Sequence, residues 1–71
     1  MAEKSFEEMN QIEKFKHNAE YNLKVHHEAL LKMESDSTPF VVVLTIRAEI
    51  EKLEKWIAEL QGELDAGKTE L

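Results

Sequence analysis

Apolar residues recur along the chain in two long series whose members stand alternately three and four residues apart. The first series is Met9, Ile12, Lys16, Ala19, Leu23, His26, Leu30 and Met33, in which a lysine and a histidine fill two of the positions. The second series is Val43, Ile46, Ile50, Leu53, Ile57, Leu60 and Leu64. This spacing places all members of a series on one face of an α-helix, so the pattern predicts two amphipathic helices.

A capping signal precedes the first series. Ser5 is followed three residues later by Glu8, which is the capping-box pattern at the start of a helix. No glycine or proline interrupts the chain from there to the end of the series. We therefore expect the first helix at residues 6–33.

The second series has its own start and stop signals. Thr38 followed by Pro39 is typical of a helix start, because threonine caps the helix and proline suits its first position. Gly67 suits the residue just beyond a helix end. We expect a turn at residues 34–38 and a second helix at residues 39–66.

Two helices of similar length joined by a short polar turn fold back on each other, since each has an apolar face to bury. The sequence therefore predicts an all-α fold, a coiled-coil-like antiparallel helical hairpin that forms one domain over residues 1–71. The periodicity leaves the register open, because it allows Leu30 to lie opposite either Ile46 or Val43.

The stretch from Phe40 to Leu44 consists of five consecutive apolar residues. A β-strand is the alternative here because valine and phenylalanine favour strands, but the chain offers no second strand to pair with it. In a helix these side chains point in all directions, and one partner helix covers only one face. We therefore expect a homo-oligomer. Its predicted interface consists of Phe40, Val41, Val42, Leu44 and Trp56, the last beside the second series.

Composition narrows the classes of function. The chain carries fifteen acidic and nine basic residues, a net charge of −6, and no cysteine. An acidic chain is a poor ligand for DNA or RNA, and the longest apolar run is too short to span a membrane. Cysteine-free composition fits a cytoplasmic protein.

The adjacent His26 and His27 diverge by about 100° on a helix, so we expect neither a metal site nor a cofactor. No catalytic motif is present, and we expect no enzyme activity.

One face of the first helix departs from the acidic average. Lys14, His17, Tyr21 and Lys24 share this face, and Glu20 is the one acid between Lys14 and His27. Lysine and histidine side chains bind phosphate oxygens, and tyrosine stacks on a nucleobase. The other interpretation is that these side chains only solvate the outer face of the helix.

The order of motifs resembles a family of small phage-encoded hairpins, the anti-CBASS and anti-Thoeris sponge proteins. The resemblance is carried by "FKHNAEY" and by "STPFVVVLTIRAEIEKLEKWIAEL", and it spans roughly Phe15 to Leu60. It implies an oligomer that sequesters cyclic nucleotide signals of bacterial immunity between its subunits. In such an oligomer the ligand-binding residues would be Lys14, His17, Tyr21, Lys24 and Arg47.

Two other classes of function remain open from the sequence. The acidic face of the second helix is suited to bind a basic protein surface, as an inhibitor, an adaptor or a nucleic-acid mimic. The chain is also suited to be a purely structural assembly module.

Overall fold

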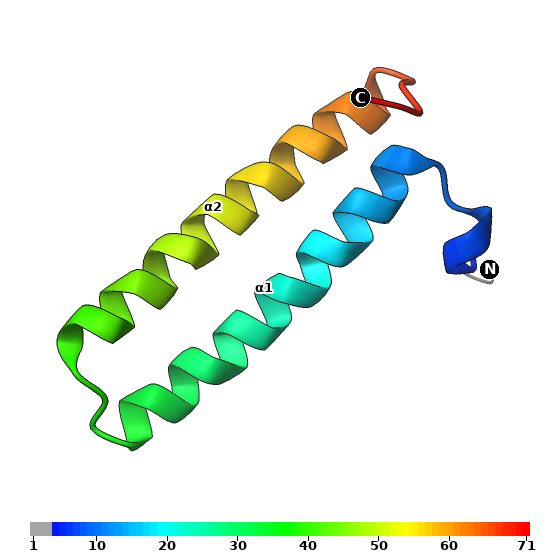
Figure 1. Ribbon diagram of the computed structural model, residues 1–71. Helices are drawn as coiled ribbons and strands as arrows, with labels where there is room; N and C mark the ends of the chain where they lie inside the picture. Colours follow the sequence, from blue (N-terminus) through cyan, green and yellow to red (C-terminus); the bar gives the residue numbers. More distant parts are fainter. Residues whose placement is uncertain (1–3) are drawn as a thin grey trace.

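The computed structural model describes residues 4–71. It contains a short 3₁₀ turn, η1 (Phe6–Glu8), and two long helices, α1 (Gln11–Ser35) and α2 (Phe40–Asp65). The two long helices lie side by side and antiparallel in an elongated molecule of 44 × 23 × 16 Å (Figure 1). The predicted all-helical hairpin is confirmed, and the part of the chain that the structure describes contains no strand.

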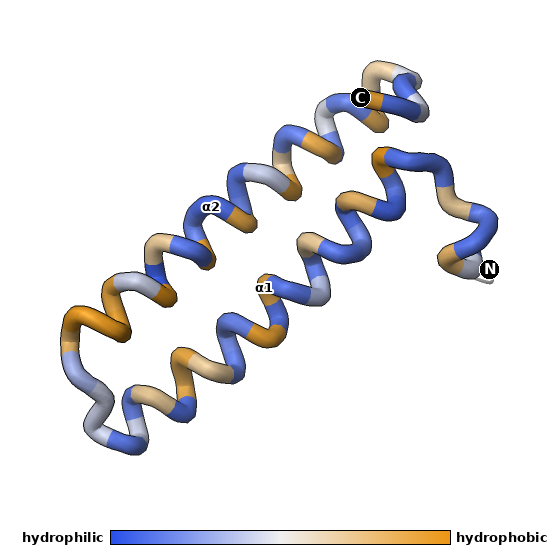
Figure 2. The backbone as a smooth tube through the Cα atoms, in the orientation of Figure 1, coloured by the Kyte–Doolittle hydropathy of each residue, from blue (hydrophilic) through white to orange (hydrophobic). Residues whose placement is uncertain are grey.

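The two apolar series meet along the seam between α1 and α2. Ile12 and Leu60 are fully buried, Ala19 and Ile50 nearly so, and the remaining members are half-buried. Figure 2 shows the hydrophobic stretches of each helix turned towards the other. The predicted seam is therefore confirmed, including the half-buried positions of its lysine and its histidine.

The predicted start of the first helix is wrong. The Ser5 side chain caps nothing, and the residues after it form only the 3₁₀ turn η1. The helix begins after Asn10, whose side chain accepts a hydrogen bond from the Glu13 N–H at 2.8 Å. The Asn10 N–H in turn donates to the Glu13 carboxylate at 3.0 Å. Asn10 and Glu13 thus form a reciprocal capping box, five residues after the predicted one.

Contacts between the two chain ends hold this start in place. The Ile12 N–H donates to the Thr69 carbonyl at 3.4 Å, and the Leu71 N–H donates to the Gln11 side chain at 2.8 Å. Because the segment after α2 bonds to the first turn of α1, the beginning of α1 is defined by a contact across the hairpin as well as by its cap.

The turn between the helices follows from the way α1 ends. α1 continues to Ser35, two residues beyond the prediction, and Ser37 then adopts a positive φ of 55°. The Thr38 N–H donates back to the Met33 carbonyl at 3.2 Å, as in a Schellman motif. Pro39 occupies the N-cap of α2, one position earlier than predicted, and no side chain caps this end. The stretch from Phe40 to Leu44 is helical, as predicted.

The end of α2 agrees closely with the prediction. α2 ends at Asp65, and Gly67 adopts a φ of 83° that favours glycine. The Lys68 N–H donates to the Glu63 carbonyl at 3.1 Å, and the Gly67 N–H donates to the Leu64 carbonyl at 2.9 Å. These two bonds form a complete Schellman motif, so the predicted stop at Gly67 is confirmed.

An ion pair near the loop defines the register. Arg47 Nη2 lies 3.1 Å from Glu34 Oε1 across the hairpin. One turn inward on each helix, Leu30 is level with Glu51 and therefore next to Ile50. The sequence could not supply this register, because an apolar pattern that repeats every turn is unchanged by a slip of one turn.

The capping box gives a direct test of this start. Replacing Asn10 by alanine removes the acceptor of the Glu13 N–H, and we expect a loss of about 1 kcal/mol in the free energy of unfolding. Ser5→Ala is the matched control, because the Ser5 side chain makes no capping bond. Urea unfolding of both variants at one protein concentration measures the difference. An equal loss in the two variants would contradict the observed start.

Candidate functional site

The four residues of the predicted binding face lie on the exposed side of α1. His17, Tyr21 and Lys24 are exposed, Lys14 is partly covered, and Tyr21 has 63% of its surface accessible. Lys14 and Lys24 form no ion pair with any residue of the described range 4–71. We call these four residues the basic face. It presents two unneutralised ammonium groups beside an accessible aromatic ring.

An unpredicted residue completes one end of the basic face. Phe6, in η1, lies against α1 with its ring centroid 5.8 Å from that of His17 and 5.3 Å from the Lys14 ammonium. The second contact is a cation–π interaction. Phe6 is not among the predicted binding residues because the predicted helix at residues 6–33 includes it in a continuous helix. The signal that could have revealed it is the second capping box, which separates residue 6 from α1.

Arg47 does not join the basic face within one hairpin. It lies near the loop and is paired with Glu34. Glu34 follows Lys24 by ten residues along α1, which corresponds to about 15 Å of helix. Of the five predicted ligand-binding residues, the structure therefore brings four together and places the fifth elsewhere.

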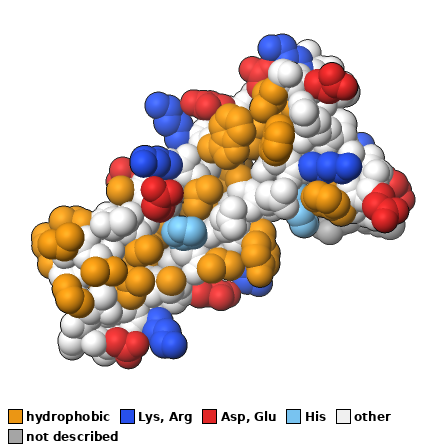
Figure 3. Space-filling model, in the orientation of Figure 1, with side chains coloured by type: hydrophobic (Ala, Val, Ile, Leu, Met, Phe, Trp, Pro, Cys, Tyr) orange, Lys and Arg blue, Asp and Glu red, His pale blue; other side chains and the backbone are white. Residues whose placement is uncertain are grey.

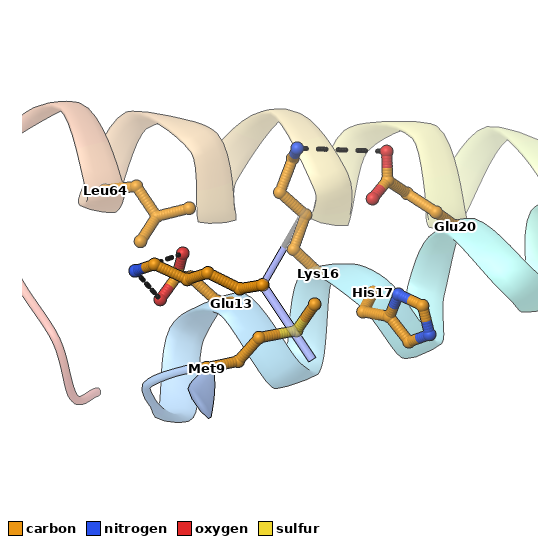
Figure 4. Close-up of a pocket in the computed structure, with 7 residues that line it drawn as sticks. Met9, Glu13, Lys16, His17, Glu20 and Leu64 are labelled. Atoms are coloured by element: carbon orange, nitrogen blue, oxygen red, sulfur yellow. Dashed lines mark hydrogen bonds and ion pairs between the residues drawn. The ribbon is translucent and has the colours of Figure 1, made fainter. Parts of the chain in front are cut away.

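A shallow pocket of about 400 Å³ lies next to the basic face, near the start of α1 (Figure 4). Its walls are Lys4, Met9, Glu13, Lys16, His17, Glu20 and Leu64. Lys4 Nζ lies 3.2 Å from Glu13 Oε1, and Lys16 Nζ lies 3.8 Å from Glu20 Oε2. Since each lysine is matched by a carboxylate, this pocket has little net charge and is less suited to an anion than the basic face.

Within residues 4–71, Glu13 is the one carboxylate whose pKa is clearly shifted. The Asn10 N–H and then the Lys4 ammonium hold the pKa of Glu13 below its ordinary value of 4.5, against the smaller opposing effect of its partial burial. Both groups favour the charged form because they donate hydrogen bonds to the carboxylate. Glu13 therefore links the start of α1 to the segment that precedes it.

A second feature lies at the loop end of the hairpin. Phe40, Val41, Val42 and Leu44 are 72%, 73%, 40% and 48% exposed. We call these four residues the loop-end cluster. Hydrophobic side chains gather at this end in Figure 3 and continue in patches along the visible face. Trp56, the fifth predicted interface residue, is 38% exposed and lies further along α2. A single hairpin leaves all five predicted interface residues accessible.

Neither metal chemistry nor a membrane span is indicated within residues 4–71. No three potential metal ligands of the His, Cys, Asp and Glu types come together there. His26 turns its Nδ1 to the Asn22 carbonyl at 2.7 Å, within its own helix. No helix in this range combines the length and the apolar character needed to cross a bilayer.

Comparison with protein-family models, with curated proteins and with solved structures finds no match to the chain. The function is therefore inferred from the exposed features of the hairpin itself.

The shifted acidity of Glu13 predicts a pH dependence. A lowered pKa means that the carboxylate stabilises the fold fully above pH 4.5, and that this contribution is lost as the pH falls through the lower, folded-state pKa. An NMR titration that follows the Asn10 amide should show a midpoint below 4.5. In Lys4→Ala the midpoint should move towards 4.5, because one of the two donors is gone. A wild-type midpoint at or above 4.5 would contradict the bonded geometry.

Proposed function

We propose that this protein acts by stoichiometric binding and not by catalysis, and that its working form is a homo-oligomer joined through the loop-end cluster. The observation that carries the proposal is the exposure of Phe40 and Val41, each more than two-thirds accessible. Adjacent large apolar side chains at one end of a small protein are typical of an interaction surface. A second copy of the chain is an occupant that is always available.

The total surface supports the same conclusion. The hairpin exposes 5526 Å², whereas a compact monomer of its mass, 8.3 kDa, exposes about 4,600 Å². The excess of roughly 900 Å² is close to the ~800 Å² that each partner buries in an interface of standard size. An extended hairpin therefore has surplus surface of the size of a standard contact.

A charge within the loop-end cluster tests the assembly. Val42→Glu would bury an unpaired carboxylate in the contact, so we expect the loop-end contact to be lost and the mean mass to fall at micromolar concentration. Ala58→Glu adds the same charge at an exposed site on α2, away from the loop, and should leave the mass unchanged. Sedimentation velocity measures both. Equal masses for Val42→Glu and Ala58→Glu would remove the loop-end cluster from the interface.

Sequestration of a cyclic nucleotide is the specific activity that we propose for such an oligomer. It is supported by Lys14 and Lys24, whose ammonium groups form no ion pair within residues 4–71, and by the accessible ring of Tyr21. It is supported also by the resemblance of the motif order to the sponge hairpins. A convex helix face cannot enclose a ligand, so the site would lie between subunits. Arg47 would take part only from another copy.

Calorimetry with a panel of cyclic di- and trinucleotides tests this activity. We expect binding of at least one of them, with an affinity that falls as salt is added, because phosphates are held by lysines. The double variant Tyr21→Ala, Lys24→Ala should lose about tenfold or more in affinity, since stacking alone contributes 1–3 kcal/mol. Lys55→Ala, an exposed lysine on α2, is the control and should bind normally.

No heat with any nucleotide, or undiminished binding by the double variant, would remove the basic face as a ligand site. Such a result would favour the other binding function, in which the acidic face of α2 docks on a basic protein.

A further inference from the structure

A second alternating series lies on α1, outside the seam. It consists of Phe15, Asn18, Asn22, Val25 and Ala29, spaced alternately three and four residues apart, and none of them is charged. We call it the outer stripe. Phe15 and Val25 are 40% and 43% exposed, and both asparagines are exposed. An uncharged series with this spacing, on a helix otherwise rich in charges, is the pattern of a helix–helix contact.

The outer stripe lies on a defined side of the hairpin. The Arg47–Glu34 ion pair marks one side of the seam. Trp56 follows Arg47 by nine residues, about two and a half helical turns, and so points to the opposite side of α2. Nine residues from the ion pair along each helix, Trp56 on α2 is level with Val25 on α1. The stripe and the exposed Trp56 ring thus belong to the side away from that ion pair.

We propose that the outer stripe binds a second copy of itself, with the two α1 helices antiparallel and related by a twofold axis at Asn22. This contact is separate from the loop-end cluster and does not depend on it. The twofold axis must pass through the middle of the outer stripe, because only then does each residue of the stripe face a residue of the partner's stripe.

Side-chain sizes match in this arrangement. Phe15 packs against Ala29 of the partner subunit, so the largest member of the stripe meets the smallest. Asn18 lies within one residue of the level of the partner's Val25, and Asn22 meets the partner's Asn22, where the two amides can hydrogen-bond to each other. A single polar layer of this kind fixes register and orientation in helix–helix contacts. A parallel arrangement would instead stack phenylalanine on phenylalanine and leave a gap between alanines.

Charges at the edge of the stripe match as well. Lys14 and Glu28 flank it on the outer edge of α1, and neither forms an ion pair within residues 4–71. With a twofold axis at Asn22, Lys14 lies two residues, about 3 Å along the helix axis, from the level of Glu28 of the partner subunit, which two long side chains can span, and symmetry forms this pair twice. A parallel arrangement would place like charges opposite each other, which is unfavourable. Charge complementarity therefore selects both the occupant and its direction.

Charge reversal tests the contact. Lys14→Glu and Glu28→Lys should each weaken association about tenfold, because each turns two attractive pairs into two repulsive ones. The double variant restores opposite charges and should regain wild-type association. Sedimentation at low salt measures the three variants, with helicity by circular dichroism as the check on folding. Unchanged single variants, or a double variant that is no better than the singles, would overturn the proposal.

A crosslink tests the geometry independently, since the chain has no cysteine of its own. Asn22→Cys places a thiol at the twofold axis and should form a disulfide-linked dimer under mild oxidation. Ala29→Cys is the control, because antiparallel docking holds its two copies about 20 Å apart. Crosslinking of both variants would indicate parallel helices, and crosslinking of neither would remove the contact; both results overturn the proposal. The Asn22→Cys crosslink should persist when Val42→Glu is added, which separates this contact from the loop-end assembly.

Discussion

The seam between α1 and α2 is the interaction on which the rest of the molecule depends. Within residues 4–71, four side chains are buried in it, those of Ile12, Ala19, Ile50 and Leu60, and the chain has no cysteine to reinforce it with a disulfide. Near the loop, the Glu34–Arg47 ion pair links the two helices. At the other end of the seam, the Ile12 N–H donates a hydrogen bond to the Thr69 carbonyl. Because a two-layer structure has no interior beyond its seam, the large apolar side chains outside the seam stay exposed, and they are available for binding.

The sequence predicts the seam completely, because alternating steps of three and four residues admit one face on each helix. It does not locate the start of α1, since Ser5 with Glu8 and Asn10 with Glu13 carry the same local signal. At the observed start, the Asn10–Glu13 cap is accompanied by a contact that is remote in sequence, the bond from the Ile12 N–H to the Thr69 carbonyl. The register escapes prediction for a related reason, because a slip of one turn preserves the apolar spacing.

The candidate site was predictable to the same extent. Lys14, His17, Tyr21 and Lys24 share a face because helical periodicity requires it. Arg47 belongs to the other helix, so its position relative to these four residues depends on the register of the hairpin. The apolar periodicity does not determine that register. The Phe6 contact depends in turn on where α1 begins. Local periodicity therefore gives the residues of one helix face, whereas contacts between elements depend on cross-hairpin bonds that have no local signal.

Association is the central claim, and the melting temperature as a function of protein concentration tests it most directly. If hairpins fold and associate together, stability contains a mass-action contribution that grows with concentration. Far-UV circular dichroism of the unmodified chain over a hundredfold range, from about 1 to 100 µM, should then show the melting temperature rising by roughly 5 °C or more. A melting temperature that stays constant over this range, with full helicity at the lowest concentration, would contradict the account and identify a hairpin stable by itself.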